Sequence, residues 1–145
     1  MVFTKKQIAN LTSQQRELIE KAKEVKKNSY SIYSKFPVGA SVLTQKGNIY
    51  VGTNMENASY GLSVCAEVGA IQSAVSAGDF EITKIAIVTN DKEKISTPCG
   101  RCRQIIFEAG EVSQTDVEVI IANKDNAFIT TISQLIPNAF GPSNV

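Results

Sequence analysis

The sequence predicts an α/β protein in which helices cover both faces of a mixed five-stranded sheet, as in a three-layer α/β/α sandwich. Segments with helical apolar spacing alternate with short apolar runs that are typical of strands. Their order is helix, two strands, helix, strand, helix, two strands and a short helix. No repeat, low-complexity tract or flexible linker divides the chain, so residues 1–145 are expected to form one domain.

The first helix is predicted to start after Thr12 and to extend to about Lys27. Thr12 and Gln15 have the spacing of a capping box, in which each side chain accepts a hydrogen bond from the other residue's backbone N–H. Four apolar residues then share one face of the helix: Leu18, Ile19, Ala22 and Val25.

Five segments have the composition of strands. Residues 38–44 and 49–53 flank a short polar turn and are predicted to form a hairpin. Residues 82–89 are largely apolar, which indicates a central strand that is buried on both faces. Residues 117–122 and 128–131 are predicted to be the remaining two strands.

Start and stop signals predict three further helices. Glycine readily adopts the left-handed conformation that ends many helices, proline is accepted in the first turn, and serine caps N-termini. The predicted helices are residues 65–77 ended by Gly78, residues 99–109 opened by Pro98 and ended by Gly110, and a short one capped by Ser133 and ended by Pro137.

The charge pattern argues against nucleic acid as a partner. Lysine and arginine total 15 and aspartate and glutamate total 14, for a net charge of +1. The densest basic stretch, residues 21–27, is interleaved with glutamates and is interpreted as a solvated helix face. No apolar run reaches signal-peptide length or the roughly 18 residues of a membrane span, so a cytoplasmic protein without membrane contacts is expected.

Three cysteines and the absence of histidine restrict the chemistry. An odd cysteine count that includes a C-x-x-C pair fits metal or redox chemistry better than a set of disulfides. Without histidine, Ser-His and Cys-His nucleophile mechanisms are excluded. Acid–base chemistry near neutral pH must then come from a carboxylate, a lysine, a cysteine or a metal-bound water.

Cys65, Cys99 and Cys102 are predicted to bind one Zn²⁺ ion, with Glu67 as a nearby acid–base group. All four residues stand near the starts of two predicted helices, where the helix dipole favours thiolates. Three thiolates leave one tetrahedral position open, as in catalytic zinc sites. Taken singly, the C-x-x-C pair could be a redox pair or half of a structural zinc site, and Cys65 and Glu67 could be ordinary helix residues. The combination favours catalysis.

C-x-E followed by P-C-x-x-C resembles the zinc deaminases, in which a glutamate that does not bind the metal acts as general acid and base. Over nearly its whole length, the chain is similar to the small homotetrameric cytidine deaminase family. The stretches that carry this resemblance are 36–40 (FPVGA), 52–60 (GTNMENASY), 65–67 (CAE), 98–102 (PCGRC) and 137–142 (PNAFGP).

The resemblance implies a cytidine deaminase-like fold, one Zn²⁺ per chain and a nucleoside substrate. The implied reaction is the hydrolytic deamination of cytidine and 2′-deoxycytidine to the uridine forms, with release of ammonia, in pyrimidine salvage. Water adds to C4 of the pyrimidine, and Glu67 protonates N3 and then the departing amine. The resemblance also implies a homotetramer whose active sites are shared between subunits.

The same resemblance implies substrate contacts. Asn54 and Glu56 match positions that hydrogen-bond the ribose 3′-hydroxyl. Phe36 matches an aromatic residue that packs on the pyrimidine, and the backbone of Ala66 matches groups that bind the polar edge of the ring. From the residues alone, Asn54 and Glu56 could instead serve a turn at a strand end, and Phe36 could be a core residue.

Three further positions match family residues near subunit boundaries. Ala58 and Tyr60 correspond to residues that complete the site of a neighbouring subunit near the 5′-hydroxyl. Phe140 resembles a C-terminal aromatic residue that reaches across an interface, and a core role for Phe140 fits equally well.

The sequence departs from many relatives at Val68, where they carry an arginine that donates to the zinc thiolates. Two arginines near the C-x-x-C pair, Arg101 and Arg103, are candidates to supply the missing positive charge. The dipoles of the two helices are the third candidate.

Three other functions share part of the pattern. A deaminase of the same fold for another cytosine nucleoside, such as blasticidin S, shares the zinc motifs but matches residues 54–57 poorly. A nucleic-acid-editing deaminase needs a basic, aromatic-lined channel, which the net charge of +1 argues against. A non-catalytic zinc-stabilised binding module requires neither an open coordination position nor Glu67.

Overall fold

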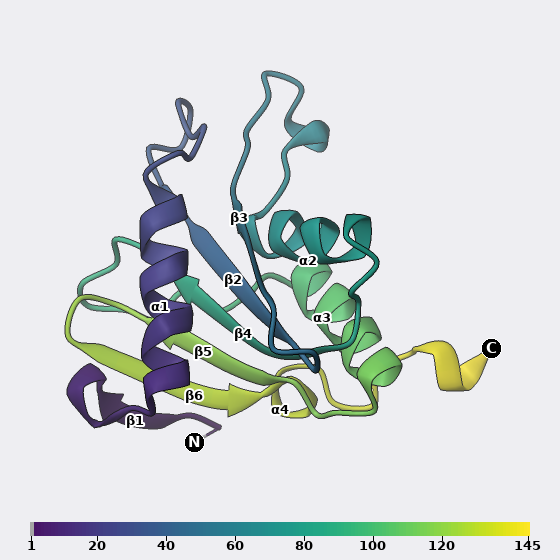
Figure 1. Cartoon of the computed structure of the whole chain (residues 1–145). Helices are drawn as coiled ribbons and strands as arrows, with labels where there is room; N and C mark the ends of the chain where they lie inside the picture. The colour runs from purple at the N-terminus through teal and green to yellow at the C-terminus, as the bar shows by residue number, and fades with distance from the viewer. Residues whose placement is uncertain (1) are drawn as a thin grey trace.

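In the computed structural model, which describes residues 2–145, six strands form one mixed sheet with helices on both faces (Figure 1). The strand order is β1-β6-β5-β4-β2-β3, in which β4 and β5 are parallel and the other neighbours are antiparallel. The strands are β1 (Thr4–Gln7), β2 (Gly39–Thr44), β3 (Ile49–Thr53), β4 (Ile82–Val88), β5 (Glu118–Ala122) and β6 (Asn126–Thr131).

The α-helices are α1 (Ser13–Lys26), α2 (Ala66–Ser76), α3 (Gly100–Ser113) and α4 (Ile132–Leu135). Short 3₁₀ turns occur at Ile8–Asn10, Tyr60–Leu62 and Pro142–Asn144. Within residues 2–145, no helix is long and apolar enough to cross a membrane.

Two apolar cores lie on opposite faces of the sheet, because successive side chains of a strand point to opposite sides. In β4, Ile85 and Ile87 belong to the core beneath α2 and α3. Ala86 and Val88 belong to the core beneath α1. The predicted arrangement of helices on both faces of a mixed sheet is therefore confirmed.

The sheet has one strand more than the predicted five. β1 lies at the edge and pairs antiparallel with β6, with Thr4 opposite Ile129. All its residues are exposed, and its sequence TKKQ has no apolar alternation that could have indicated a strand. Backbone pairing with β6 rather than side-chain burial therefore stabilises this strand.

The predicted end of α3 at Gly110 was wrong. The helix continues to Ser113 and ends at Gln114, which adopts the left-handed conformation with φ 54°. Glycine at position 110 serves packing instead, because a Cβ there would lie 2.8 Å from the carbonyl oxygen of Thr115. A sequence pattern cannot distinguish these two uses of glycine when both occur near a helix end.

The N-cap predictions had different outcomes. The Thr12 capping box of α1 is confirmed, since Thr12 and Gln15 exchange hydrogen bonds of 3.1 Å. Ser133 does not cap α4 but lies inside it, and its N–H and hydroxyl both donate to the Asp116 carboxylate. This helix also ends before Pro137.

The contact between α2 and β3 is close because both elements carry small residues there. A Cβ on Gly52 of β3 would lie 2.2 Å from the backbone nitrogen of Ala70 in α2. Glycine at this position therefore sets the distance between the helix and the sheet. The loops that follow α1 and β3 project from the same end of the sheet, where α2 and α3 begin (Figure 1).

Candidate active site

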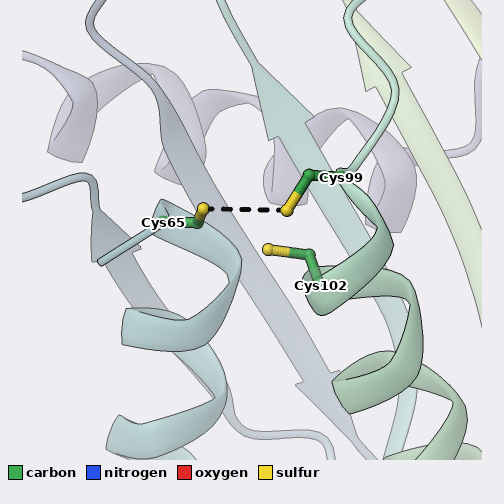
Figure 2. Close-up of side chains that lie close together, drawn as sticks. All are labelled: Cys65, Cys99 and Cys102. Carbon is green, nitrogen blue, oxygen red and sulfur yellow. Dashed lines mark hydrogen bonds between the residues drawn. The ribbon is translucent and has the colours of Figure 1, made fainter. Parts of the chain in front are cut away.

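Cys65, Cys99 and Cys102 lie together at the N-terminal ends of α2 and α3. Cys65 is the N-cap of α2, Cys99 is the N-cap of α3, and Cys102 lies in the first turn of α3. Their Sγ atoms are all within 4.8 Å of one another, and those of Cys65 and Cys99 are 4.0 Å apart. Figure 2 shows the three side chains converging from the two helices. The fold thus assembles the predicted metal ligands.

This thiol cluster has the chemistry and spacing that a Zn²⁺ ion requires. With Zn–S bonds of about 2.3 Å, tetrahedral geometry separates sulfur atoms by about 3.8 Å. All three cysteines are free thiols. Among residues 2–145, they form the single group of metal-binding side chains close enough to share an ion. Three thiolates leave a fourth position for a reacting molecule, so the residues fit a catalytic zinc site.

The thiols differ in their acidity. A hydrogen bond from Cys102 lowers the pKa of Cys65 to about 6, and the positive charge of Arg101 contributes in the same direction. The same hydrogen bond, together with burial, raises the pKa of Cys102. Of these two thiols, Cys65 is therefore the one that ionises first, and its place at a helix N-terminus favours the thiolate.

Glu67 lies in the first turn of α2 and is only 6% exposed. Burial raises the pKa of its carboxyl group to about 7, and the negative charge at Cys65 contributes in the same direction. A hydrogen bond from the backbone N–H of Glu67 lowers this pKa in part. A carboxyl group that titrates near neutral pH can both accept and donate a proton, as an acid–base catalyst must.

A pocket of about 260 Å³ opens beside the thiol cluster. The loops after α1 and β3 and the first residues of α2 and α3 provide most of its lining. The predicted site residues in this lining are Phe36, Asn54, Glu56, Cys65, Ala66, Glu67 and Cys99. The carboxyl group and two of the thiols therefore face a space that a small molecule can enter.

Asn54 holds the loop that carries Phe36. Its Oδ1 accepts hydrogen bonds from the Val38 N–H at 2.9 Å and the Ser29 hydroxyl at 2.5 Å, and its Nδ2 donates to the carbonyl oxygen of Phe36 at 2.9 Å. Asn54 therefore does stabilise the turn at the strand end, the alternative role considered above. It leaves one Nδ2 hydrogen available to a ligand, since the amide carries two.

Glu56, like Asn54, holds a loop and can still bind a ligand. Its Oε1 accepts the N–H groups of Tyr33 and Ser34 at 3.0 and 3.1 Å. Hydrogen bonds from Ser34 and Tyr33 hold the pKa of this carboxyl group below its usual range, so it is ionised at neutral pH. A carboxylate has about four acceptor sites, so Glu56 retains capacity for a ligand hydroxyl.

Three predicted residues lie outside the pocket of the single chain. Tyr60 is 79% exposed and packs edge-on against Tyr33, with ring centroids 6.3 Å apart. Ala58 is exposed in the same loop. Phe140 is 65% exposed, and its carbonyl oxygen accepts a hydrogen bond from Gln104. The exposure of Phe140 contradicts the alternative of a core role.

The pocket also contains polar residues that were not predicted. Thr89, Ser96 and Thr97 line it from the segment between β4 and Cys99. Single serines and threonines in a polar loop resemble any solvent-exposed loop, so composition could not have indicated them. Their position between a central strand and the P-C-x-x-C motif was the one available signal.

Arg101 and Arg103 have different surroundings. The Arg103 guanidinium donates to the carbonyl oxygens of Pro98 and Leu135 at 2.7 and 2.9 Å, and to the Thr97 hydroxyl at 3.0 Å. Arg103 therefore holds the segment before Cys99 rather than donating to a thiol. The positive charge of Arg101 lowers the pKa of Cys65, although less than the hydrogen bond from Cys102 does.

Comparison with known proteins agrees with this geometry. A family model of the cytidine and deoxycytidylate deaminase zinc-binding region matches residues 12–118. The cytidine deaminases of Sporosarcina psychrophila and Halalkalibacterium halodurans are 38% and 39% identical to this chain over 130 and 124 residues. These matches cover 89% and 85% of this chain and 93% and 91% of the relatives.

A crystal structure of cytidine deaminase from Burkholderia pseudomallei matches the fold with a TM-score of 0.80 at 38% identity, and the match covers 90% of this chain and all of that one. The fold and the thiol site together define a hydrolytic deaminase whose metal cofactor is Zn²⁺. Within this class, the chain belongs to the cytidine and deoxycytidylate deaminase family. The family membership predicted from the motifs is confirmed.

Proposed function

We propose that this protein catalyses the hydrolytic deamination of cytidine and 2′-deoxycytidine to uridine and 2′-deoxyuridine, as a step of pyrimidine salvage. One observation carries the proposal: the buried Glu67 carboxyl and two thiols of the cluster, those of Cys65 and Cys99, line the same pocket. The similarity to cytidine deaminases over nearly the whole chain supports this choice of substrate.

Cys65, Cys99 and Cys102 are the residues that hold Zn²⁺ in this proposal. A bound zinc ion lowers the pKa of a water molecule and so supplies hydroxide near neutral pH. Glu67 accepts a proton from the attacking water and delivers it to N3 of the pyrimidine. It then accepts the second proton of that water, from the new hydroxyl at C4, and delivers it to the departing amine, so the carboxylate is regenerated. One water molecule is consumed and one ammonia molecule leaves for each uridine formed.

The pocket residues orient the nucleoside. The ring of Phe36, partly exposed at the pocket, packs against the pyrimidine. Asn54 and Glu56 bind the ribose 3′-hydroxyl with the donor and acceptor capacity that their loop contacts leave free. Ala66 is the first residue of α2, so its N–H has no acceptor within the helix and can donate to the polar edge of the ring.

We also propose that residues 1–145 form one catalytic domain that assembles into a cytoplasmic homotetramer with shared sites. Several large apolar side chains around the two projecting loops and the C-terminus are exposed, and such patches mark interaction surfaces. They include Tyr30, Tyr60, Leu62 and Phe140. In the tetramer, Ala58 and Tyr60 would complete a neighbouring site near the 5′-hydroxyl, and Phe140 would cross an interface.

Ultraviolet absorbance of cytidine, measured on a sample whose zinc content is also known, tests the function. The expected result is a zinc-to-chain ratio near one with turnover of cytidine and deoxycytidine, and little turnover of blasticidin S. A fully zinc-loaded sample that converts neither nucleoside would reject the proposal and favour a non-catalytic zinc module. Light scattering of the same sample measures its molecular mass and so tests the tetramer. The variant Tyr60→Ala, which lacks one of these exposed side chains, is measured for comparison.

A further inference from the structure

The loop between α1 and β2 carries Phe36 to the catalytic pocket and projects beside the loop that follows β3 (Figure 1). Side chains hold the Phe36 backbone on both sides. Its N–H donates to the Ser34 hydroxyl at 3.1 Å, and its carbonyl oxygen accepts a hydrogen bond from Asn54 Nδ2 at 2.9 Å. Phe36 is 37% exposed, so packing fixes the ring only in part. These two hydrogen bonds therefore help to determine where the ring lies.

The residue before Phe36 has a backbone conformation that needs such support. Lys35 has φ 58°, in the left-handed region that residues with a Cβ seldom adopt. Strain of this kind persists where the surrounding contacts hold the chain in place. The Lys35 N–H donates to the carbonyl oxygen of Ser31 at 2.9 Å, and the hydrogen bond between Ser34 and Phe36 spans Lys35.

Ser34 is itself held by Glu56. Oε1 of Glu56 accepts the N–H of Ser34 at 3.1 Å and that of Tyr33 at 3.0 Å. Hydrogen bonds thus run from Glu56 to Ser34 and from Ser34 to Phe36. Since Asn54 holds the other side of Phe36, the two residues proposed to bind the ribose also fix the loop that carries the aromatic ring.

Ser34 lies next to the catalytic pocket rather than in its lining. It lines an adjoining cavity of about 350 Å³, which shares Glu56 and Ser63 with the catalytic pocket. The side chain is exposed and belongs to neither apolar core. Its hydroxyl therefore influences the catalytic pocket through Phe36, whose N–H it accepts.

We propose that Ser34 is a positioning residue for the pyrimidine, because its hydroxyl fixes the Phe36 backbone and so places the aromatic ring before the nucleoside binds. This role rests on the proposed function, since the pyrimidine is taken as the partner of Phe36. A ring that is already in place avoids the entropy loss of ordering the loop on binding. The ring contacts the pyrimidine equally before and in the transition state, so Ser34 affects KM rather than kcat.

Steady-state kinetics of the zinc-loaded protein with cytidine test this role. Ser34→Ala removes the acceptor of the Phe36 N–H, and KM is expected to rise about three- to tenfold, as for the loss of one hydrogen bond, with kcat changed less than about twofold. Ser34→Thr keeps the hydroxyl and is expected to retain the wild-type KM. Ser31→Ala is the matched control in the same loop, because the Ser31 hydroxyl contacts that of Ser29 and not Phe36. Its KM is expected to change less than about twofold.

A double-mutant cycle with Phe36→Ala distinguishes positioning of the ring from a direct contact with the sugar. Without the ring, Ser34→Ala is expected to raise KM by less than about twofold further. An equal rise in both backgrounds would mean that Ser34 acts independently of the ring and would overturn the proposal. An unchanged KM in Ser34→Ala, or the same loss in Ser34→Thr as in Ser34→Ala, would overturn it as well.

Amide exchange of the ligand-free protein, measured by NMR, tests the same hydrogen bond without turnover. Faster exchange of the Phe36 N–H in Ser34→Ala than in Ser31→Ala supports the positioning role, and equal exchange in the two variants would overturn it. The two proposals fail in different ways. A zinc-loaded wild type without turnover would reject the proposed function, whereas an active wild type whose KM is unaffected by Ser34→Ala would reject the role of Ser34 alone.

Discussion

At the scale of single residues, the thiol cluster concentrates negative charge beside the buried carboxyl of Glu67. Two helix N-termini point at this charge, and their dipoles stabilise thiolates there. Val68 provides no charge where many relatives carry an arginine. Arg101 contributes through its field at Cys65, whereas Arg103 binds the segment before Cys99. The two candidates for the missing charge therefore have separate roles.

Replacing Glu67 with glutamine tests the proton-transfer role. The amide has nearly the same size but cannot accept a proton, so turnover is expected to fall by about 10²–10⁴-fold or more. Zinc content is expected to stay near one per chain, because Glu67 is not part of the thiol cluster proposed to bind the metal. Metal analysis and the cytidine assay on the same sample measure both quantities. Near-normal turnover would remove Glu67 from the mechanism.

Replacing Arg103 with alanine tests its positioning role. The loss of three hydrogen bonds frees the Thr97–Pro98 segment and is expected to cost about 1–3 kcal/mol of stability. Zinc should then be lost to a chelator faster than in the wild type, and KM should rise. Arg101→Ala, which removes none of these hydrogen bonds, is the control for charge. Zinc retention unchanged from the wild type would contradict this role.

At the scale of elements, the contact of α2 with β3 determines where Cys65 and Glu67 lie. Gly52 of β3 lies against the α2 backbone at Ala70, so the helix cannot move without changing the sheet contact. The same helix begins at the pocket with Cys65 as its N-cap. The packing of α2 against the sheet therefore fixes the positions of the proposed zinc ligand Cys65 and the proposed acid–base group Glu67.

Gly52→Ala tests this link between packing and chemistry. Its Cβ would lie 2.2 Å from the Ala70 nitrogen, and overpacking of this kind costs about 1–3 kcal/mol or more. The expected result is a lower Tm together with lower zinc content. Gly61→Ala is the matched control, because a Cβ there meets no atom within 4 Å. If the two variants had equal Tm and zinc content, the close contact would not be the cause.

At the scale of the whole molecule, Asp79 connects α2 to the hairpin of β2 and β3. This buried carboxylate follows α2 and accepts hydrogen bonds from Thr44, Asn48 and Tyr50 at 2.9, 2.8 and 3.1 Å. The bond from Asn48 is the largest of the effects that hold the pKa of Asp79 below its usual range. The far end of the sheet from the catalytic pocket thus depends on an ionised group.

The stability of the protein is therefore expected to decrease in acid. A carboxyl group whose folded pKa is lowered stabilises the fold above its unfolded pKa of about 3.9, and the contribution disappears as pH falls through the folded pKa. Asp79→Asn is expected to have a lower Tm at about pH 7 and a smaller decrease in Tm between about pH 5 and pH 2. Parallel Tm curves for the two proteins would contradict this role of Asp79.

Local patterns were sufficient for most of the elements. The Thr12 capping box and the apolar runs of β2 to β5 depend on neighbours in the chain, which a sequence displays directly. β1 was missed because its side chains are all exposed and its stability comes from pairing with β6, whose residues are more than a hundred positions away. Gly110 was misinterpreted because the helix continues past it to Ser113, and its close contacts with Thr115 and Val117 depend on how the chain turns after the helix.

The sequence by itself determined the donor set of Cys65, Cys99 and Cys102, the nearby Glu67 and the family to which they point, because residue type and spacing carry that chemistry. Only the tertiary structure decided what surrounds them. It brought Ser96 and Thr97 into the pocket, turned Arg103 toward the loop, and left Phe140 exposed. Each of these outcomes depends on which distant segments come into contact when two cores form on one sheet. The spacing of residues along the sequence does not determine those contacts.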